Sequence, residues 1–91
     1  METVNQILNE RGARYGTFKG QAEISQTMKM LVDRYVHDRE CHLSHDQTEA
    51  LQMIIHKIAR IINGDPNYID SWVDIAGYAT LVADRLNGVE R

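Results

Sequence analysis

The strongest constraint on the fold is a row of branched apolar residues in the second half of the chain. They recur every three or four positions, the spacing that places side chains along one side of an α-helix. The row consists of Leu51, Ile54, Ile55, Ile58, Ile61 and Ile62. Ser44 and Gln47, just before it, have the spacing of a capping box, and Gly64 follows it as a stop signal. The pattern predicts a helix over residues 45–63.

Weaker patterns predict three more helices. After the loop GDPN, a second apolar arc predicts a helix that ends before Asn87 and Gly88, with Asn67 or Asp70 as its N-cap. The arc consists of Trp72, Ile75, Ala76, Ala79, Val82, Ala83 and Leu86. A helix over residues 21–38 is predicted from Ile24, Met28, Leu31, Val32 and Tyr35, and a short one over residues 2–11 from Val4, Ile7 and Leu8. We expect these apolar arcs to face a common core.

The remaining pattern indicates a single helical domain. No segment alternates apolar and polar residues between two turn signals, as a half-buried strand would. The only proline, Pro66, lies in the loop before the last helix, and no linker or repeat divides residues 1–91. We therefore expect an all-α fold, a small antiparallel bundle of three long helices plus a short N-terminal helix.

Size and charge limit the class of protein. A chain of 91 residues buries only about 60 to 65 % of its unfolded surface, and a single cysteine, Cys41, allows no internal disulfide. We therefore expect a homo-oligomer. A formal net charge of -3 argues against a general nucleic-acid binder. With no secretory start and no apolar run of bilayer length, the expected location is the cytoplasm, with no membrane partner.

The polar sides of the last two helices carry complementary charges. One stripe consists of Glu49, Met53, His56 and Arg60, with Lys57 at its edge, and the other of Asp70, Asp74, Gly77, Tyr78 and Leu81. A short loop makes the two helices antiparallel, so Asp74 could form a structural ion pair with Lys57 or Arg60. Glycine costs a helix about 1 kcal/mol relative to alanine. Gly77 therefore suggests close approach of another backbone, and we expect a partner chain on this side of the helix.

The same acidic residues permit a metal interpretation. Asp70 and Asp74 lie one helical turn apart and could share Mg²⁺ with Glu49, the ion that supports hydrolysis of phosphate esters and anhydrides. Three carboxylates are few for a hydrolytic Mg²⁺ site. We therefore keep Mg²⁺ binding as an alternative hypothesis, and the main hypothesis, binding without catalysis, requires no cofactor. The cluster Cys41, His42 and His45 suggests zinc, but structural zinc sites usually take ligands from two separate segments.

Residues 9–23, NERGARYGTFKGQAE, are expected to form a loop ahead of a helix. Glycines allow close backbone approach, and a helix N-terminus attracts phosphate. Aromatic rings such as Tyr15 and Phe18 could stack on a base or simply anchor the loop to the core. The expected ligand-binding residues are Arg11, Arg14, Tyr15, Lys19, Lys57, Arg60 and Tyr78.

The segments RGARYGTF, KIARI and DSWVDIAGYATL together resemble a family of small bacteriophage and prophage proteins of unknown function. Its motifs are Arg-x-x-Tyr-Gly, Lys-x-x-Arg and Asp-x-x-x-Asp-x-x-x-Tyr. More distantly, the last two helices are similar to those of the MazG-like all-α nucleoside triphosphate pyrophosphatases, whose paired acids bind Mg²⁺. By this resemblance Asp74 matches the final acid and Asp70 its partner, at a spacing of four instead of three. Gln52 and Met53 stand where the preceding helix would carry its second acid.

These observations lead to one main hypothesis and two alternatives. The main hypothesis is an oligomeric phage accessory protein that binds a phosphorylated small molecule, a nucleotide, without catalysis and could sequester a host nucleotide signal. The first alternative is a divergent Mg²⁺-dependent MazG-like pyrophosphatase. The second is a protein-interaction module that inhibits a host enzyme.

Overall fold

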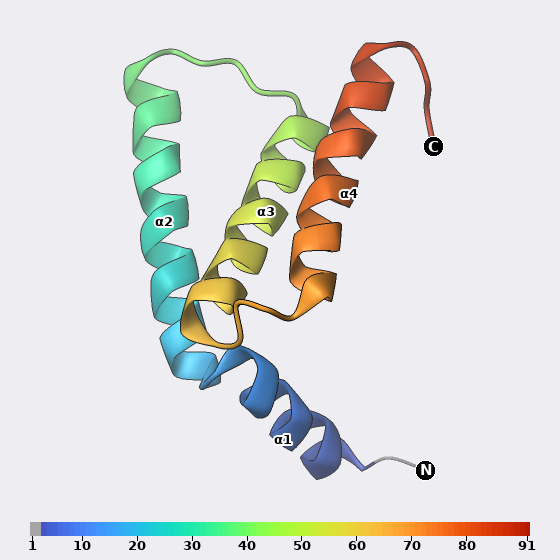
Figure 1. Ribbon diagram of the computed structural model, residues 1–91. Helices are drawn as coiled ribbons and strands as arrows, with labels where there is room; N and C mark the ends of the chain where they lie inside the picture. Colours follow the sequence, from blue (N-terminus) through green and yellow to red (C-terminus); the bar gives the residue numbers. More distant parts are fainter. Residues whose placement is uncertain (1–2) are drawn as a thin grey trace.

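The computed structural model describes residues 3–91, which form four α-helices and no strand (Figure 1). The helices are α1 (Val4–Tyr15), α2 (Phe18–Asp38), α3 (His45–Asn63) and α4 (Ile69–Leu86). This confirms the predicted all-α class, with three long helices and a shorter N-terminal one. No helix in the described part of the chain is long and apolar enough to cross a membrane.

The predicted limits of α3 agree with the structure, and those of α2 are close. The side-chain oxygen of Gln47 accepts a hydrogen bond from the backbone N–H of Ser44 at 3.0 Å, which is half of the predicted capping box. Helix α2 begins at Phe18, three residues earlier than predicted. The reason is that the Thr17 hydroxyl caps it by accepting from the N–H of Gly20 at 3.1 Å.

The predicted end of α1, the predicted start of α4 and the predicted first loop need correction. Helix α1 continues to Tyr15, and only Gly16 and Thr17 separate it from α2. Residues 9–23 are therefore mostly helical. Residue 2, where α1 was predicted to begin, lies outside the described residues. Neither predicted N-cap of α4 holds, because Tyr68 takes that position. The N–H of Asn67 donates to the Asp65 carboxylate at 2.9 Å, which keeps this segment in a turn.

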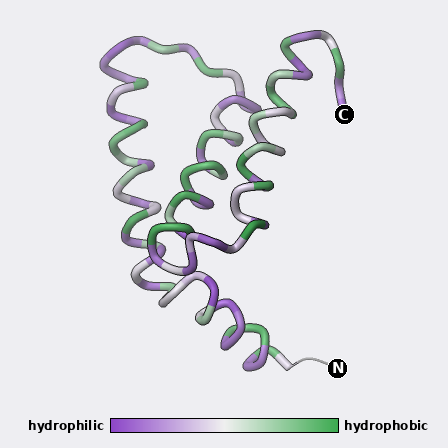
Figure 2. The backbone as a smooth tube through the Cα atoms, in the orientation of Figure 1, coloured by the Kyte–Doolittle hydropathy of each residue, from purple (hydrophilic) through white to green (hydrophobic). Residues whose placement is uncertain are grey.

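The three long helices lie side by side in one layer with α3 in the middle (Figure 1). Helix α3 contacts both α2 and α4, whereas α2 and α4 do not contact each other. Hydrophobic positions recur along all three (Figure 2). The apolar residues buried in the described chain are only Ala50, Ile55, Ala59 and Ile61. The bundle is therefore open, with a small core along the two seams of α3.

Helix α4 is rotated relative to the prediction. Ser71, on its α3 side, is buried, while Trp72 and Leu86 of the predicted core arc are 54 % and 61 % exposed. Polar contacts fix this rotation, because Asp74 and Arg85 both bind side chains of α3. Of the predicted arc, Ile75 and Val82 are half-buried, whereas the other members are exposed and do not point into the core of their own chain.

Candidate functional site

The connection between α1 and α2 is held against the end of α3 by hydrogen bonds. The side-chain amide of Asn63 donates to the carbonyl oxygens of Tyr15 at 2.8 Å and Thr17 at 2.9 Å. The N–H of Asp65 donates to the carbonyl of Arg14 at 2.7 Å. We call this contact the junction. It joins segments 48 residues apart in the sequence.

Two glycines allow the backbones to meet at the junction. A Cβ on Gly64 would lie closer than 3.0 Å to backbone atoms of Arg14 and Tyr15. Gly16 has a positive φ of 74°, and a Cβ there would lie equally close to the carbonyl of Asn63. The glycines of this region were expected to form a loop that could bind phosphate, whereas Gly16 packs against the end of α3.

The junction assembles two arginines and two tyrosines, which we call the cation–aromatic cluster: Arg14, Tyr15, Arg60 and Tyr68. The Arg60 guanidinium lies 4.3 Å from the centre of the Tyr15 ring, and that of Arg14 lies 4.8 Å from the centre of the Tyr68 ring. The two rings meet edge to face with their centroids 6.0 Å apart. Within residues 3–91 neither arginine forms an ion pair.

The cluster combines free donors with one neighbouring carboxylate. The Nε atom of Arg60 is buried and has no hydrogen-bond partner among the described residues. A guanidinium stacked on a ring still has its N–H groups in its own plane, where they can donate to two oxygens at once. The Tyr68 hydroxyl donates to Asp70 at 2.9 Å, and this bond raises the pKa of Tyr68. Two positive charges and one negative charge therefore meet here.

Lys57 forms the ion pair that the sequence suggested. Its Nζ lies 3.0 Å from a carboxylate oxygen of Asp74, and its side chain is only 12 % exposed. The Asp74 side chain is 46 % exposed, so water screens the pair and its contribution to stability is at most about 1 kcal/mol. Lys57 is thus held by Asp74, whereas Arg60 is held by Tyr15.

The structure does not gather the acidic residues considered for Mg²⁺. Asp70 accepts from Tyr68, Asp74 binds Lys57, and Glu49 lies two helical turns from Lys57 toward the other end of α3. Among residues 3–91 no three His, Cys, Asp or Glu side chains lie close enough to hold a metal ion. The set Cys41, His42 and His45 therefore does not form a zinc site in this structure. Binding of Mg²⁺ would require Asp70 and Asp74 to exchange their present partners.

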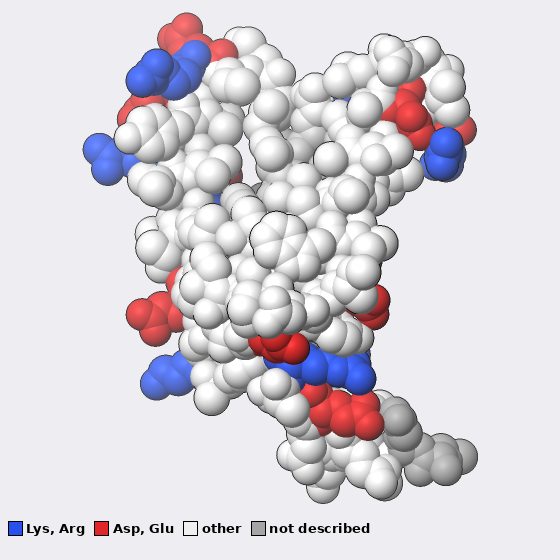
Figure 3. All heavy atoms as spheres, viewed as in Figure 1, with Lys and Arg blue, Asp and Glu red and all other residues white. Residues whose placement is uncertain are grey.

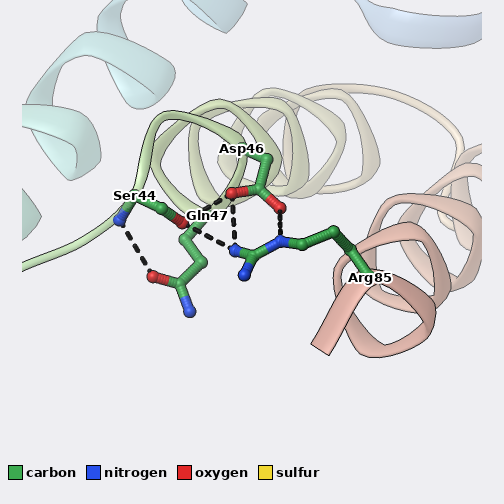
Figure 4. Close-up of polar contacts among 4 residues, drawn as sticks. All are labelled: Ser44, Asp46, Gln47 and Arg85. Carbon is green, nitrogen blue, oxygen red and sulfur yellow. Dashed lines mark hydrogen bonds and ion pairs between the residues drawn. The ribbon is translucent and has the colours of Figure 1, made fainter. Parts of the chain in front are cut away.

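A groove of about 600 Å³ lies at the other end of the layer, between the first half of α3 and the second half of α4, and Glu49 and Tyr78 contribute to its lining. Arg85 also lines it and binds the start of α3 (Figure 4). Its Nε is 2.7 Å from Oδ2 of Asp46, and its Nη2 is 2.8 Å from Oγ of Ser44. These bonds hold the pKa of Asp46 far below its ordinary range.

The predicted ligand-binding residues are thus divided among several places. Arg14, Tyr15 and Arg60 meet in the cluster, and Tyr78 lies in the distant groove. Arg11 and Lys19 are exposed on α1 and α2. Tyr68 was not among the residues predicted from sequence, although its place in the loop between the two charged helices could have indicated it.

His56 lies partly buried between α2 and α3, where its ring contacts the side-chain amide of Gln21 at 3.3 Å. Burial lowers the pKa of His56, and the positive charges of Arg60, Lys29 and Lys57 lower it further. The unfolded chain therefore takes up a proton at a higher pH than the folded chain, so acid favours unfolding through this residue.

We accordingly expect the free energy of unfolding to fall as pH decreases from 7.5 through the ordinary histidine pKa of about 6.5. Urea unfolding at several pH values would measure this slope. The matched variant His56→Gln keeps a polar partner for Gln21 but cannot be protonated, so its slope over the same range should be smaller. Equal slopes in both proteins would contradict the role of His56.

The fold and the cluster together define a small all-α protein with a cation–aromatic surface where its first helix meets the layer. The chain belongs to the family described as domain of unknown function (DUF6378), whose sequence model matches residues 1–86. Neither a search of curated proteins nor a search of solved structures found a match.

Proposed function

We propose that this protein binds a phosphorylated small molecule, with a nucleotide as the ligand class, at the cation–aromatic cluster. The observation that supports this is the pair of arginines, Arg14 and Arg60, each lying on a tyrosine ring without a carboxylate partner in an ion pair. A cation held in this way is oriented in advance, so less side-chain entropy is lost when an anion binds.

Each part of a nucleotide has a complementary group in the cluster. Phosphate oxygens accept bidentate hydrogen bonds from guanidinium groups, and within residues 3–91 neither Arg14 nor Arg60 forms an ion pair. A base can stack on an aromatic ring or on the plane of a guanidinium. The carboxylate of Asp70, bonded to Tyr68, lies beside the cluster and can accept a hydrogen bond from a ribose hydroxyl or an exocyclic amine.

The proposal includes binding without turnover. Hydrolysis of a phosphoanhydride by a MazG-like mechanism would use several carboxylates on one Mg²⁺, and here Asp74 is paired with Lys57 and Asp70 with Tyr68. A protein that binds a nucleotide and does not consume it could lower the free concentration of a host nucleotide signal. We propose this as its role, as an accessory protein of phage type acting in the host cytoplasm.

Removing one arginine of the cluster should weaken nucleotide binding without unfolding the protein. For Arg60→Ala and Arg14→Ala we expect a loss of roughly 1.5 to 3 kcal/mol each, or about 10- to 150-fold in Kd, the range for hydrogen bonds to charged groups. Calorimetric titration with mono-, di- and cyclic nucleotides would measure it. The control is Arg34→Ala, since Arg34 is exposed on α2, far from the cluster in sequence, and pairs with Asp38.

Two results would contradict the proposal. Absence of binding by the wild-type protein to every nucleotide of the panel would exclude this ligand class. Release of pyrophosphate from nucleoside triphosphates with Mg²⁺, abolished by Asp74→Ala, would instead establish the pyrophosphatase alternative. Melting temperatures of all variants, measured in parallel, show whether a lost activity reflects a lost fold.

A further inference from the structure

The layer formed by α2, α3 and α4 lacks a second layer. Globular domains pack at least two layers of secondary structure around one core. In residues 3–91 no large side chain is fully buried. The chain therefore supplies only one side of a core.

The apolar residues that do not lie at a seam share one face of this layer. The side chains of α3 that bind α4, such as Lys57, and those that meet α2, such as His56, leave a third side of the helix free. This side carries apolar residues except for Gln47 in the first turn. Helix periodicity places the open apolar arcs of α2 and α4 on the same side of the layer. We call this surface the apolar face. Its most exposed large members are Leu31, Tyr35, Leu51, Ile62, Trp72 and Leu86, each 40 to 64 % exposed.

The apolar face carries no charge in its middle. Figure 3 shows Lys, Arg, Asp and Glu side chains at the ends and edges of this side of the molecule, with only uncharged residues between them over the three long helices. Exposed apolar patches of this extent mark protein interaction surfaces. The middle of the apolar face has no charged side chain, so it offers no site for a partner with a complementary charge.

The exposed area indicates how much of the chain a partner covers. The accessible surface is 6942 Å², whereas a folded monomer of 10.4 kDa is expected to expose about 5400 Å². The radius of gyration is 15.2 Å, against about 12 Å for a globular chain of this length. The protruding α1, which has no buried residue, accounts for part of the difference. The total excess of about 1500 Å² is an upper limit for the apolar face, and it lies in the range that each subunit of an obligate homodimer buries.

We propose that a second copy of this chain covers the apolar face, so that two three-helix layers pack face to face about a two-fold axis. A chain whose own core is this small is stabilised by a partner on the apolar face, and a second copy is always present at equal concentration. In the second half of α4 the small side chains of Ala79 and Ala83 allow a facing helix to approach closely. Arg60 lies almost opposite Ile62 around α3, so both cation–aromatic clusters remain accessible.

This interface differs from the one predicted from sequence. The sequence placed the partner on Gly77, Tyr78 and Leu81, but Tyr78 lines the groove between α3 and α4, and Leu81 lies on the other side of α4 from the apolar face. Ile62 and Leu81 are 64 % and 48 % exposed in the single chain. A glutamate at either position is therefore compatible with the fold of one chain, and only the position in the interface should affect association.

The test compares wild-type protein, Ile62→Glu and Leu81→Glu by light scattering over a dilution series. We expect wild type and Leu81→Glu to have twice the chain mass of 10.4 kDa at micromolar concentration. For Ile62→Glu, which would bury two unpaired carboxylates, the dimer Kd should rise roughly a hundredfold or more. The melting temperature of the wild type should increase with protein concentration.

The single tryptophan gives a readout that needs no variant. Trp72 is 54 % exposed in the chain and belongs to the apolar face. In the dimer its fluorescence should resist quenching by acrylamide, and dilution below the dimer Kd should restore quenching. A folded wild-type monomer at micromolar concentration with freely quenched Trp72 would overturn the proposal. So would a dimer that Leu81→Glu dissociates and Ile62→Glu does not. If Ile62→Glu fails to fold, concentration-dependent melting and protected Trp72 of the wild type support the dimer, and their absence overturns it.

Discussion

Replacing Gly64 with alanine is expected to lower the free energy of unfolding by about 3 kcal/mol. The added Cβ would lie closer than 3.0 Å to backbone atoms of Arg14 and Tyr15, and backbone cannot move aside as a flexible side chain can. Either α1 separates from α3 or the turn after α3 changes its path. Urea unfolding followed by circular dichroism would measure the loss.

Gly12→Ala is the matched control for this substitution. Gly12 lies inside α1, and a Cβ there would have no neighbour within 4 Å. Alanine is the better helix former, so this variant should be more stable than wild type by about 0.5 to 1 kcal/mol or equally stable. If the midpoint of urea unfolding is the same for Gly64→Ala as for the wild type, the backbones at the junction do not lie as close as described.

The second large effect is expected for Asn63→Asp. The amide of Asn63 donates to the carbonyls of Tyr15 and Thr17, whereas a carboxylate can only accept and would face both oxygens unpaired. We expect a loss of about 2 to 4 kcal/mol in the free energy of unfolding, because two hydrogen bonds are replaced by repulsion. The same variant should bind nucleotide more weakly, since the junction positions Arg14 and Tyr15.

A carboxylate at the end of a helix is also unfavourable toward the helix dipole, and Asn87→Asp controls for this. Asn87 caps α4, and within residues 3–91 its hydrogen bonds are made by its backbone. Asn87→Asp should lower the free energy of unfolding by no more than about 1 kcal/mol. Equal losses in the two variants would mean that the amide of Asn63 has no special role.

The elements could be predicted from sequence because their signals are local. The apolar row of α3, the Ser44 and Gln47 spacing before it and Gly64 after it lie within or next to the helix they define. The path of residues 9–23 was predicted incorrectly, because three glycines suggested a loop. Helix α1 tolerates Gly12, and Thr17 supplies a cap that starts α2 earlier.

The rotation of α4 could not be predicted from its own pattern. Its apolar arc was expected to face the core of the same chain, but periodicity alone does not show whether an apolar side meets its own chain or another. The pairs of Asp74 with Lys57 and Arg85 with Asp46 fix the rotation, and only the first was expected. For the same reason the cation–aromatic cluster was found only in part, since Tyr68 meets Tyr15 and Arg14 through the junction.

The attachment of α1 has a consequence for hydrogen exchange. This helix has no buried residue, and the junction holds only its last turn. Its first turns should therefore open by local unfolding, at a rate that is independent of the global stability of the layer. The amide of Asp65, bonded to Arg14 across the junction, should exchange more slowly than those of the first turns. A ligand that bridges Arg14 and Arg60 would protect this end of α1 further, so amide exchange could locate the binding surface without any substitution.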